Sequence, residues 1–307
     1  IAAATEGRIT VRVYGGGEIV PALKCNDAVQ EGTADMYHSA DYYYQGKIQA
    51  YPFFCTVPFG FTPAEMDAWN AYGGGQALWD EVGAQFGIKH LPGGSTGSQM
   101  GGWFRRPMQS VDDFRGLKMR IPGLGGDVIT ELGGTTVTLA GAEILPALQA
   151  GTVDAAEWVG PWNDLAFGFH KILKLYHWPG FHEPGPLLSF GIGLRIWDGL
   201  SDSDKMLFDS TARAVNNLTL ADFNANNSDA LDTLVNEHGV ELVEFSDDIY
   251  RAIGQASKDV LARAGQADPL TKKVYESVMD FRKKAIGWTR LSDQTYANKR
   301  ALTDFSA

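Results

Sequence analysis

The sequence predicts an α/β protein made of two lobes with a similar build. Two distant segments, Gly7–Glu18 and Gly116–Asp127, each read as a glycine, an alternating strand, a glycine-rich turn and an acidic residue that opens a helix. A second pattern, A-x-Q-x-G-T-x-D, follows each of them, at Ala28–Met36 and Ala147–Ala155. Each copy describes a helix end, a glycine suited to the left-handed position after it, and a new strand. Because this order of elements occurs twice, we expect two α/β units.

Composition and charge narrow the class of protein. The chain has 307 residues, 44% of them hydrophobic, which is enough for one large core or two modest ones. A net charge of −11 without any basic cluster argues against a nucleic-acid partner, because phosphate binding requires a cationic face. No apolar run reaches the roughly 20 residues that a membrane-spanning helix requires.

Hydrophobic spacing predicts the remaining elements. The segment Thr62–Phe86 has the pattern of a helix interrupted at Gly73–Gly75. Further strands and surface helices are predicted, in chain order, as follows: strands at Phe104–Arg106 and Met119–Ile121, helices at Asp202–Asn217 and Asn224–Glu237, and a strand at Gly239–Phe245.

A long helix is predicted at the C-terminal end, with Pro269 at its first turn and Asp268 as its N-cap. Its apolar residues recur every three or four positions, as in a coiled-coil seam: Leu270, Val274, Val278, Phe281, Ala285 and Trp288. This seam packs either on the body of its own chain or across to a second copy.

Cys25 and Cys55 are the only cysteines, and they lack the spacing of zinc ligands. In an exported protein we expect them to form one disulfide, and the alternative is two buried free thiols. The chain opens at Ile1 on what reads as the last turn of a helix, so we expect further residues before it in the natural product.

Enzyme motifs are present only in fragments. Gly93–Gly97 matches G-x-S-x-G with Ser95 as the nucleophile of a hydrolase, but the segment that follows is glycine-rich and favours no helix. The turn Gly123–Gly126 resembles a dinucleotide loop, but Val128 replaces its third glycine. His182 and Glu183 form a lone pair of metal-ligand types, which is more often ordinary polar packing.

A carboxylate-binding site suits the sequence better. Arg120 ends a predicted strand next to the glycine-rich turn, and only arginine presents a planar fork that matches two carboxylate oxygens. Aromatic residues that can wall such a site are abundant: Tyr42, Tyr43, Tyr44, Trp103, Phe104, Trp158, Trp162 and Trp178. The alternative is a structural salt bridge at Arg120 and aromatic residues that fill cores.

The central block, GLKMRIPGLGGDVITELGGTTVTLAGAEILPALQAGTVDAAEWVGPWNDLAFGFHK (Gly116–Lys171), closely resembles the solute-binding proteins of TRAP transporters. The resemblance is strongest to the branch that binds 2-oxo acids such as pyruvate. Three other segments are similar to that branch: GSTGSQMGGWFRRP (Gly94–Pro107), VPFGFTPAEMDAW (Val57–Trp69) and WPGFHEPG (Trp178–Gly185). The likeness runs from about Gly7 to Leu200, and the family's first strand and most of its first helix have no counterpart before Ile1.

The resemblance implies a two-lobed, type II-like periplasmic-binding-protein fold with the ligand cleft between the lobes. Lobe I is expected at residues 1–97 and about 183–235, and lobe II at 98–182 and about 236–267. Residues 268–307 form a C-terminal helical extension. The resemblance also implies a periplasmic location and a receptor that catalyses no reaction.

The family pattern also assigns site residues. Arg120 of the M-R-I-P motif corresponds to the carboxylate anchor. A sodium or calcium ion is implied, held by Gln99, Glu157 and the backbone carbonyl of Trp158. Tyr43 and Glu183 are carried over as pocket lining.

The expected partners are a small organic carboxylate, the membrane subunits of a TRAP transporter and a second copy bound through the C-terminal helix. The carboxylate is a 2-oxo acid or a related hydroxy or aromatic acid. A hydrolase at Ser95 and a ligand-sensing receptor for a signalling partner stay open as alternatives.

Overall fold

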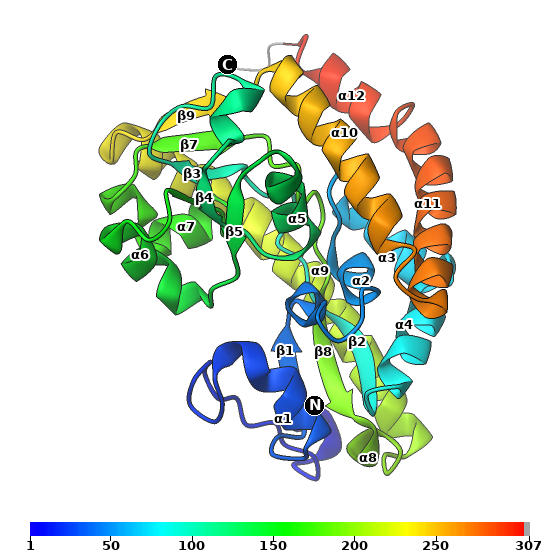
Figure 1. Ribbon diagram of the computed structural model, residues 1–307. Helices are drawn as coiled ribbons and strands as arrows, with labels where there is room; N and C mark the ends of the chain where they lie inside the picture. The colour runs from blue at the N-terminus through cyan, green and yellow to red at the C-terminus, as the bar shows by residue number, and fades with distance from the viewer. Residues whose placement is uncertain (304–307) are drawn as a thin grey trace.

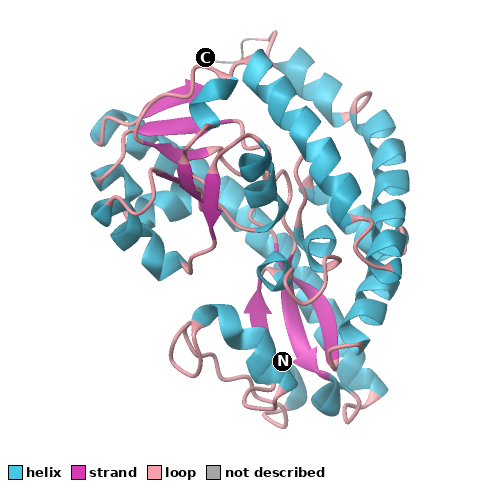
Figure 2. Cartoon of the chain, viewed as in Figure 1, coloured by secondary structure: helices cyan, strands magenta, loops and turns pink. Residues whose placement is uncertain are grey.

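The computed structural model describes residues 1–303 and has an α/β architecture with two separate sheets (Figures 1 and 2). The strands are β1 Met36–Ser39, β2 Ile88–Gly94, β3 Gly102–Phe104, β4 Lys118–Arg120, β5 Thr135–Val137, β6 Ala155–Ala156, β7 Leu175–Trp178, β8 Leu188–Gly193 and β9 Glu241–Glu244. The helices are α1 Cys25–Gln30, α2 Tyr51–Cys55, α3 Pro63–Tyr72, α4 Gly75–Ala84, α5 Gly123–Glu131, α6 Gly141–Ala150, α7 Pro161–Phe167, α8 Leu194–Trp197, α9 Asp202–Asp232, α10 Asp247–Ala264, α11 Pro269–Thr289 and α12 Asp293–Arg300. In the described part of the chain, no helix combines the length and the apolar character that a membrane crossing requires.

The smaller sheet has the strand order β1-β8-β2, and both of its pairings are antiparallel. The larger sheet has the order β5-β4-β6-β3-β7-β9 and mixes parallel with antiparallel pairs. The A-x-Q-x-G-T-x-D pattern has the predicted structure in both: α1 leads through Gly32 (φ 79°) to β1, and α6 leads through Gly151 (φ 70°) to β6. A left-handed glycine therefore joins helix to strand once in each lobe.

In the larger sheet, β4 lies between β5 and β6 and is parallel to both. Parallel strands end at the same edge of a sheet, so the residues after β4 and β6 are neighbours. Arg120 pairs with Ala156 at the end of this register, and the amide of Glu157 donates to the Arg120 carbonyl at 3.2 Å. This edge sets the position of the residues described below.

Three segments connect the two sheets. Residues 95–101 lead from β2 to β3, residues 179–187 return from β7 to β8, and α9 joins the smaller sheet to β9. Helix α9 has 31 residues, spans about 46 Å at 1.5 Å per residue, and packs against both β2 and α7 (Figure 1). The two predicted helices at Asp202–Asn217 and Asn224–Glu237 are thus one helix that ends in a π-helical turn, Thr233–Glu237.

The C-terminal helices wrap around one side of the molecule, as Figure 1 shows in orange and red. The Asp268 carboxylate caps α11 as predicted, accepting from the amides of Leu270 and Thr271 at 2.9 Å. The seam, however, mostly packs on its own chain. Helix α11 contacts α2, α3 and α4. The first four seam residues pack on the core there: Leu270, Val274, Val278 and Phe281. The last two, Ala285 and Trp288, lie beyond this contact, and Trp288 is exposed.

Other predictions from the sequence are corrected. The segment Gly7–Glu18 forms no strand, and Arg8 anchors it to Asp204 of α9 at 2.6 and 3.0 Å. The strand predicted at Phe104–Arg106 runs instead over Gly102–Phe104, since its pairing with β7 begins at Gly102.

The predicted disulfide is wrong, because both cysteines are free thiols in separate surroundings. The sulfur of Cys25 lies 2.8 Å from the Tyr44 hydroxyl, whereas Cys55 is fully buried against Ala40 and Tyr42.

Candidate functional site

The residues predicted to form a site converge from both lobes and from the segments that connect them. Arg120 and Glu157 end neighbouring strands of the larger sheet, Tyr43 follows β1, and the connecting segments supply the rest: Gln99 from residues 95–101, and His182 and Glu183 from residues 179–187. The backbone ties the two connecting segments together, because the Gln99 amide donates to the Glu183 carbonyl at 3.1 Å and the Gly180 amide to the Gln99 carbonyl at 3.2 Å.

Arg120 is the centre of the cluster, and only 1% of its surface is exposed. Nε and Nη2 donate to the Leu139 carbonyl at 3.2 and 3.0 Å, Nη1 donates to the Glu157 carbonyl at 3.1 Å, and Nη2 donates to the Tyr43 hydroxyl at 3.1 Å. Nη1 also donates to Oε1 of the Glu157 carboxylate. A guanidinium has five N–H groups, so each one has an acceptor. Burial alone would lower the pKa of Arg120, but Tyr43 and Glu157 raise it above its usual value.

Two further buried groups, His182 and Glu183, lie beside this ion pair. Glu157, His182 and Glu183 each present a ligand-type atom, and these atoms lie within 4.8 Å of one another. His182 Nε2 is 3.1 Å from Glu157 Oε2, and Gln99 Nε2 donates to Glu183 Oε2 at 2.9 Å. Burial, followed by the negative charge of Glu157, raises the pKa of Glu183 well above its ordinary value. His182, interpreted from the sequence as ordinary polar packing, therefore belongs to the cluster.

Two oxygen atoms of this cluster have no hydrogen-bond donor within residues 1–303. Oε1 of Gln99 is buried without a partner, and the backbone carbonyl of Trp158 accepts no hydrogen bond. Buried oxygens normally have partners, so the unpartnered Oε1 of Gln99 suits an atom that binds oxygen. Neutral and carboxylate oxygens suit a hard cation such as sodium or calcium. The three residues predicted to hold the ion thus offer chemistry that fits it.

The aromatic residues divide between the site and the core. The Trp158 ring lies 5.2 Å from the Arg120 guanidinium carbon, and Tyr42 packs edge to face on Tyr43 with ring centres 4.7 Å apart. The others lie elsewhere: Trp103 stacks on Tyr176 in the core, Phe104 and Tyr44 are also core residues, Trp162 packs on Phe223 and Trp178 is partly exposed.

Asp164 is a buried carboxylate, not predicted from the sequence, that supports the backbone beside the site. Asp164 of α7 accepts hydrogen bonds from Trp103 Nε1 at 2.9 Å, from the Tyr176 hydroxyl at 2.7 Å and from the Val159 amide at 3.1 Å. Burial raises the pKa of Asp164 to about 7, although these donors act in the opposite direction. By holding Val159, Asp164 fixes the backbone that follows Glu157 and Trp158.

The glycine-rich turn after β4 serves close packing. Gly123 has a φ of 62°, and a side chain there would meet the Tyr42 Cβ at 3.2 Å. At Gly125, a Cβ would lie 2.8 Å from the Cβ of His182. These two glycines let the start of α5 approach the site residues from both sides, which accounts for the pattern without a dinucleotide.

The geometry removes the basis for a hydrolase at Ser95. Ser95 is buried, and its hydroxyl accepts from the Gly97 amide at 3.4 Å. The chain after it runs to β3 without forming a helix, so the sharp strand-to-helix turn that exposes a nucleophile is missing.

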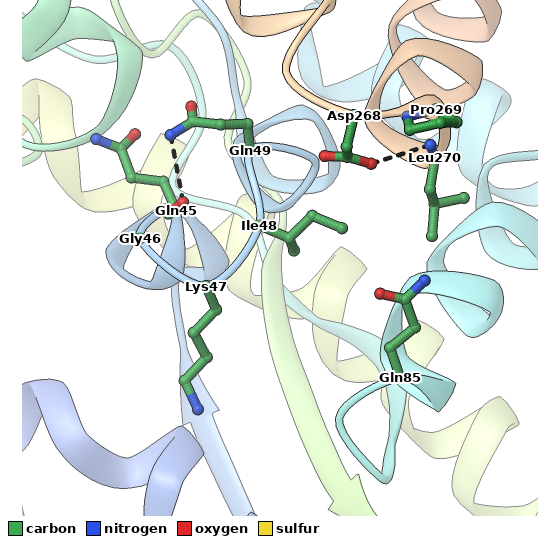
Figure 3. Close-up of a pocket in the computed structure, with 9 residues that line it drawn as sticks. All are labelled: Gln45, Gly46, Lys47, Ile48, Gln49, Gln85, Asp268, Pro269 and Leu270. Carbon is green, nitrogen blue, oxygen red and sulfur yellow. Dashed lines mark hydrogen bonds between the residues drawn. The ribbon is translucent and has the colours of Figure 1, made fainter.

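A separate surface pocket of about 650 Å³ lies where the loop before α2 approaches the start of α11 (Figure 3). Its walls include the side chains of Gln45, Gln49 and Gln85, and the Asp268 carboxylate turns aside to cap α11. This pocket shares no residue with the Arg120 cluster.

Known proteins resemble this chain along almost its whole length. A monocarboxylate 2-oxoacid-binding periplasmic protein of Nostoc sp. PCC 7120 is 40% identical over 298 residues, which cover 97% of this chain and 82% of the relative.

Two solved structures of TRAP solute-binding proteins are also similar. One, from Pseudoalteromonas atlantica T6c with bound sodium and pyruvate, has a TM-score of 0.93 and 37% identity, covering 97% of this chain and 90% of that one. The other, from Bordetella bronchiseptica RB50, has a TM-score of 0.95 and 31% identity, covering 98% and 89%. It is a dimer of mixed occupancy with calcium and picolinate in one site.

The family model for bacterial extracellular solute-binding proteins of family 7 (DctP) matches residues 1–267. The members of this family bind solutes, in agreement with the expectation that the chain is a receptor and not an enzyme. The chain belongs to the DctP family of extracellular solute-binding proteins.

Proposed function

We propose that this protein is the periplasmic receptor of a TRAP transporter and binds a small 2-oxo acid, such as pyruvate, through Arg120. The observation that carries the proposal is the buried guanidinium, whose planar fork is held at the end of β4 by the backbone carbonyls of Leu139 and Glu157. A monocarboxylate needs one such fork for orientation and an enclosed, partly aromatic wall for desolvation. Tyr43 and Trp158 supply that wall next to the guanidinium.

A sodium or calcium ion belongs to the same proposal. Gln99, Glu157 and the Trp158 carbonyl would hold it, and the unpartnered Oε1 of Gln99 is the support from this chain. When bound, the ion supplies positive charge that offsets the negative charge of the solute. Glu183, which Gln99 contacts, lines the same cluster.

The solute must reach charged and polar side chains that are at most 7% exposed: Arg120, Gln99, Glu157, His182 and Glu183. We assign lobe I to residues 1–97 and about 183–235, and lobe II to 98–182 and about 236–267, so that the short segments between β2 and β3 and between β7 and β8 act as the hinge. Rotation about these segments would open Arg120 to solvent and close it again on the solute.

Membrane subunits of a TRAP transporter are the proposed partners, in keeping with the family, and a signalling partner is the second candidate for the same receptor. A homodimer is proposed through the end of α11 and α12, where Trp288, Leu291 and Tyr296 are 66–72% exposed. Light scattering of the whole chain over a wide range of concentrations tests the dimer, and a constant monomer mass would exclude it.

Calorimetry tests the binding function directly. Purified protein, unfolded and refolded to remove any resident solute, is titrated with pyruvate, 2-oxobutyrate, lactate and picolinate in buffers containing sodium or calcium. We expect saturable one-to-one binding of a 2-oxo acid without turnover. Absence of binding for every acid under both conditions would contradict the proposal.

A further inference from the structure

The Arg120 guanidinium has no N–H group left for a solute. Its five N–H groups are shared among two backbone carbonyls and two side chains, the Tyr43 hydroxyl and the Glu157 carboxylate. Any solute carboxylate that binds in the bidentate manner has to displace acceptors that are already there.

The backbone acceptors cannot leave easily. The Glu157 carbonyl follows β6, and the amide of the same residue is bonded to the Arg120 carbonyl, so moving the Glu157 backbone would pull apart the ends of β4 and β6. The Leu139 carbonyl accepts two N–H groups of Arg120 at once. Displacement therefore falls on side chains, and Glu157 is the one that carries the same functional group as the solute.

Within residues 1–303, the Glu157 carboxylate contacts only side chains, Arg120 through Oε1 and His182 through Oε2. Its Oε2 lies 3.1 Å from His182 Nε2, and it stands in the cluster with Glu183, to which the Gln99 side chain donates. A carboxylate released by Arg120 would then be available to the cation that we propose at this cluster. Without a cation, the carboxylates of Glu157 and of the solute would share one buried guanidinium. One negative charge would then be buried without compensation, which disfavours binding of the solute.

We propose that Glu157 is a built-in substitute for the solute carboxylate, which holds Arg120 in the empty receptor and is exchanged for the solute. The inference rests on the proposed function and deepens it, because it makes Glu157 both the competitor of the solute and the link between solute and cation. It follows that this residue sets how strongly the affinity for a carboxylate depends on the cation.

Glu157→Gln provides the test, because glutamine keeps the shape but competes weakly for a guanidinium. Pyruvate, as its N-methylglucamine salt, is titrated by calorimetry into chelator-treated protein and into protein saturated with calcium. Without metal we expect Glu157→Gln to bind pyruvate at least about tenfold more tightly than wild type. With calcium we expect the reverse order. An unchanged or weaker metal-free affinity in the variant overturns the exchange.

A second measurement uses wild-type protein, in case the variant does not fold. Protein labelled with ¹³C-glutamate is saturated with metal-free pyruvate and compared with the empty protein by infrared difference spectroscopy. We expect a shift of a glutamate carboxylate band, and absence of any glutamate band overturns the proposal. The proposed function is tested separately, by binding of pyruvate to wild type with calcium. If that binding is present while both tests fail, only the exchange is lost.

Discussion

Gln99 and Glu183 are joined twice, once through the backbone amide of Gln99 at 3.1 Å and once through its side-chain nitrogen at 2.9 Å. These contacts fix the amide group so that its Oε1 points away from Glu183 and is buried without a partner. The orientation of a single amide therefore decides where the cluster presents its free neutral oxygen.

Gln99→Met should weaken cation binding, because methionine keeps the volume but replaces an oxygen ligand with a soft sulfur. We expect the affinity for calcium to fall by about tenfold, the effect of losing roughly 1.4 kcal/mol. Calorimetric titration of calcium in the presence of pyruvate measures the change. Gln109→Met, at an exposed position, is the matched control, and equal affinities in the two variants would contradict the assignment of Gln99.

Arg120→Lys should weaken carboxylate binding although the charge is conserved. Lysine lacks the planar fork, and its three N–H groups cannot serve all four acceptors that Arg120 contacts. We expect a loss of roughly 1.5–3 kcal/mol in pyruvate binding with calcium present. Calorimetry of this variant beside Arg106→Lys, an exposed arginine, makes the comparison. An affinity like that of wild type would mean that the anchor lies elsewhere.

Asp164→Asn should destabilise the packing of α7 against the larger sheet. The carboxylate accepts from Trp103, Tyr176 and Val159, and an amide nitrogen in place of either oxygen would face the N–H of Trp103 or of Val159, neither of which can accept. We expect the free energy of unfolding in urea to fall by roughly 2–3 kcal/mol. Asp209→Asn, which alters a surface ion pair with Arg213, should change it by less than about 1 kcal/mol. Similar changes in the free energy of unfolding for the two variants would show that Asp164 has no special structural role.

The free energy of unfolding should decrease as the pH is lowered, and His177 is one cause. Burial lowers its pKa to about 4, and its Nε2 accepts from the Met108 amide at 3.1 Å, so the folded protein keeps the ring neutral. The unfolded chain takes up a proton near pH 6.5. The contribution of the neutral ring is therefore complete above pH 6.5 and is lost progressively down to about pH 4, by roughly 3 kcal/mol.

His177→Gln retains an acceptor for Met108 and does not titrate. Urea unfolding measured at intervals from pH 7.5 to 4 should give a shallower pH dependence for the variant than for wild type. Parallel curves would show that His177 does not contribute to acid sensitivity.

Both cysteines should be free thiols. When the denatured, unreduced protein is alkylated, mass spectrometry should detect two added groups. Detection of none would show that the two cysteines form a disulfide. In the folded protein we expect Cys55 to resist alkylation, because burial raises its pKa well above the ordinary value and excludes the reagent.

Local signals in the sequence predicted the parts of the fold that local interactions determine. Gly32 and Gly151 end helices in the left-handed conformation, and Asp268 caps α11, because each depends on a few neighbouring residues. The alternation of Ile9, Val11 and Val13 predicted a strand that does not form. A strand requires a partner, and this segment has none in the described chain. The sequence predicted a break between Asn217 and Asn224, yet packing of α9 on β2 and α7 keeps the helix continuous.

The site could be predicted only in part for the same reason. Arg120 stood out through its strand-end position, and the family pattern supplied Gln99 and Glu157. Nothing in the sequence connects Asp164 with Trp103 and Tyr176, which meet only when α7 folds against the larger sheet. That Glu157 occupies Arg120 likewise depends on the parallel register of β4 and β6, which sequence spacing does not reveal.

The segments between β2 and β3 and between β7 and β8 have one more consequence. They are the shortest connections between the two sheets, and they also carry Gln99, His182 and Glu183. A rotation of one lobe against the other would turn these backbones, so the ligand atoms would separate in the same motion. The receptor would then need no separate latch, since a filled site is itself the obstacle to opening, and the solute could leave only as the hinge turns.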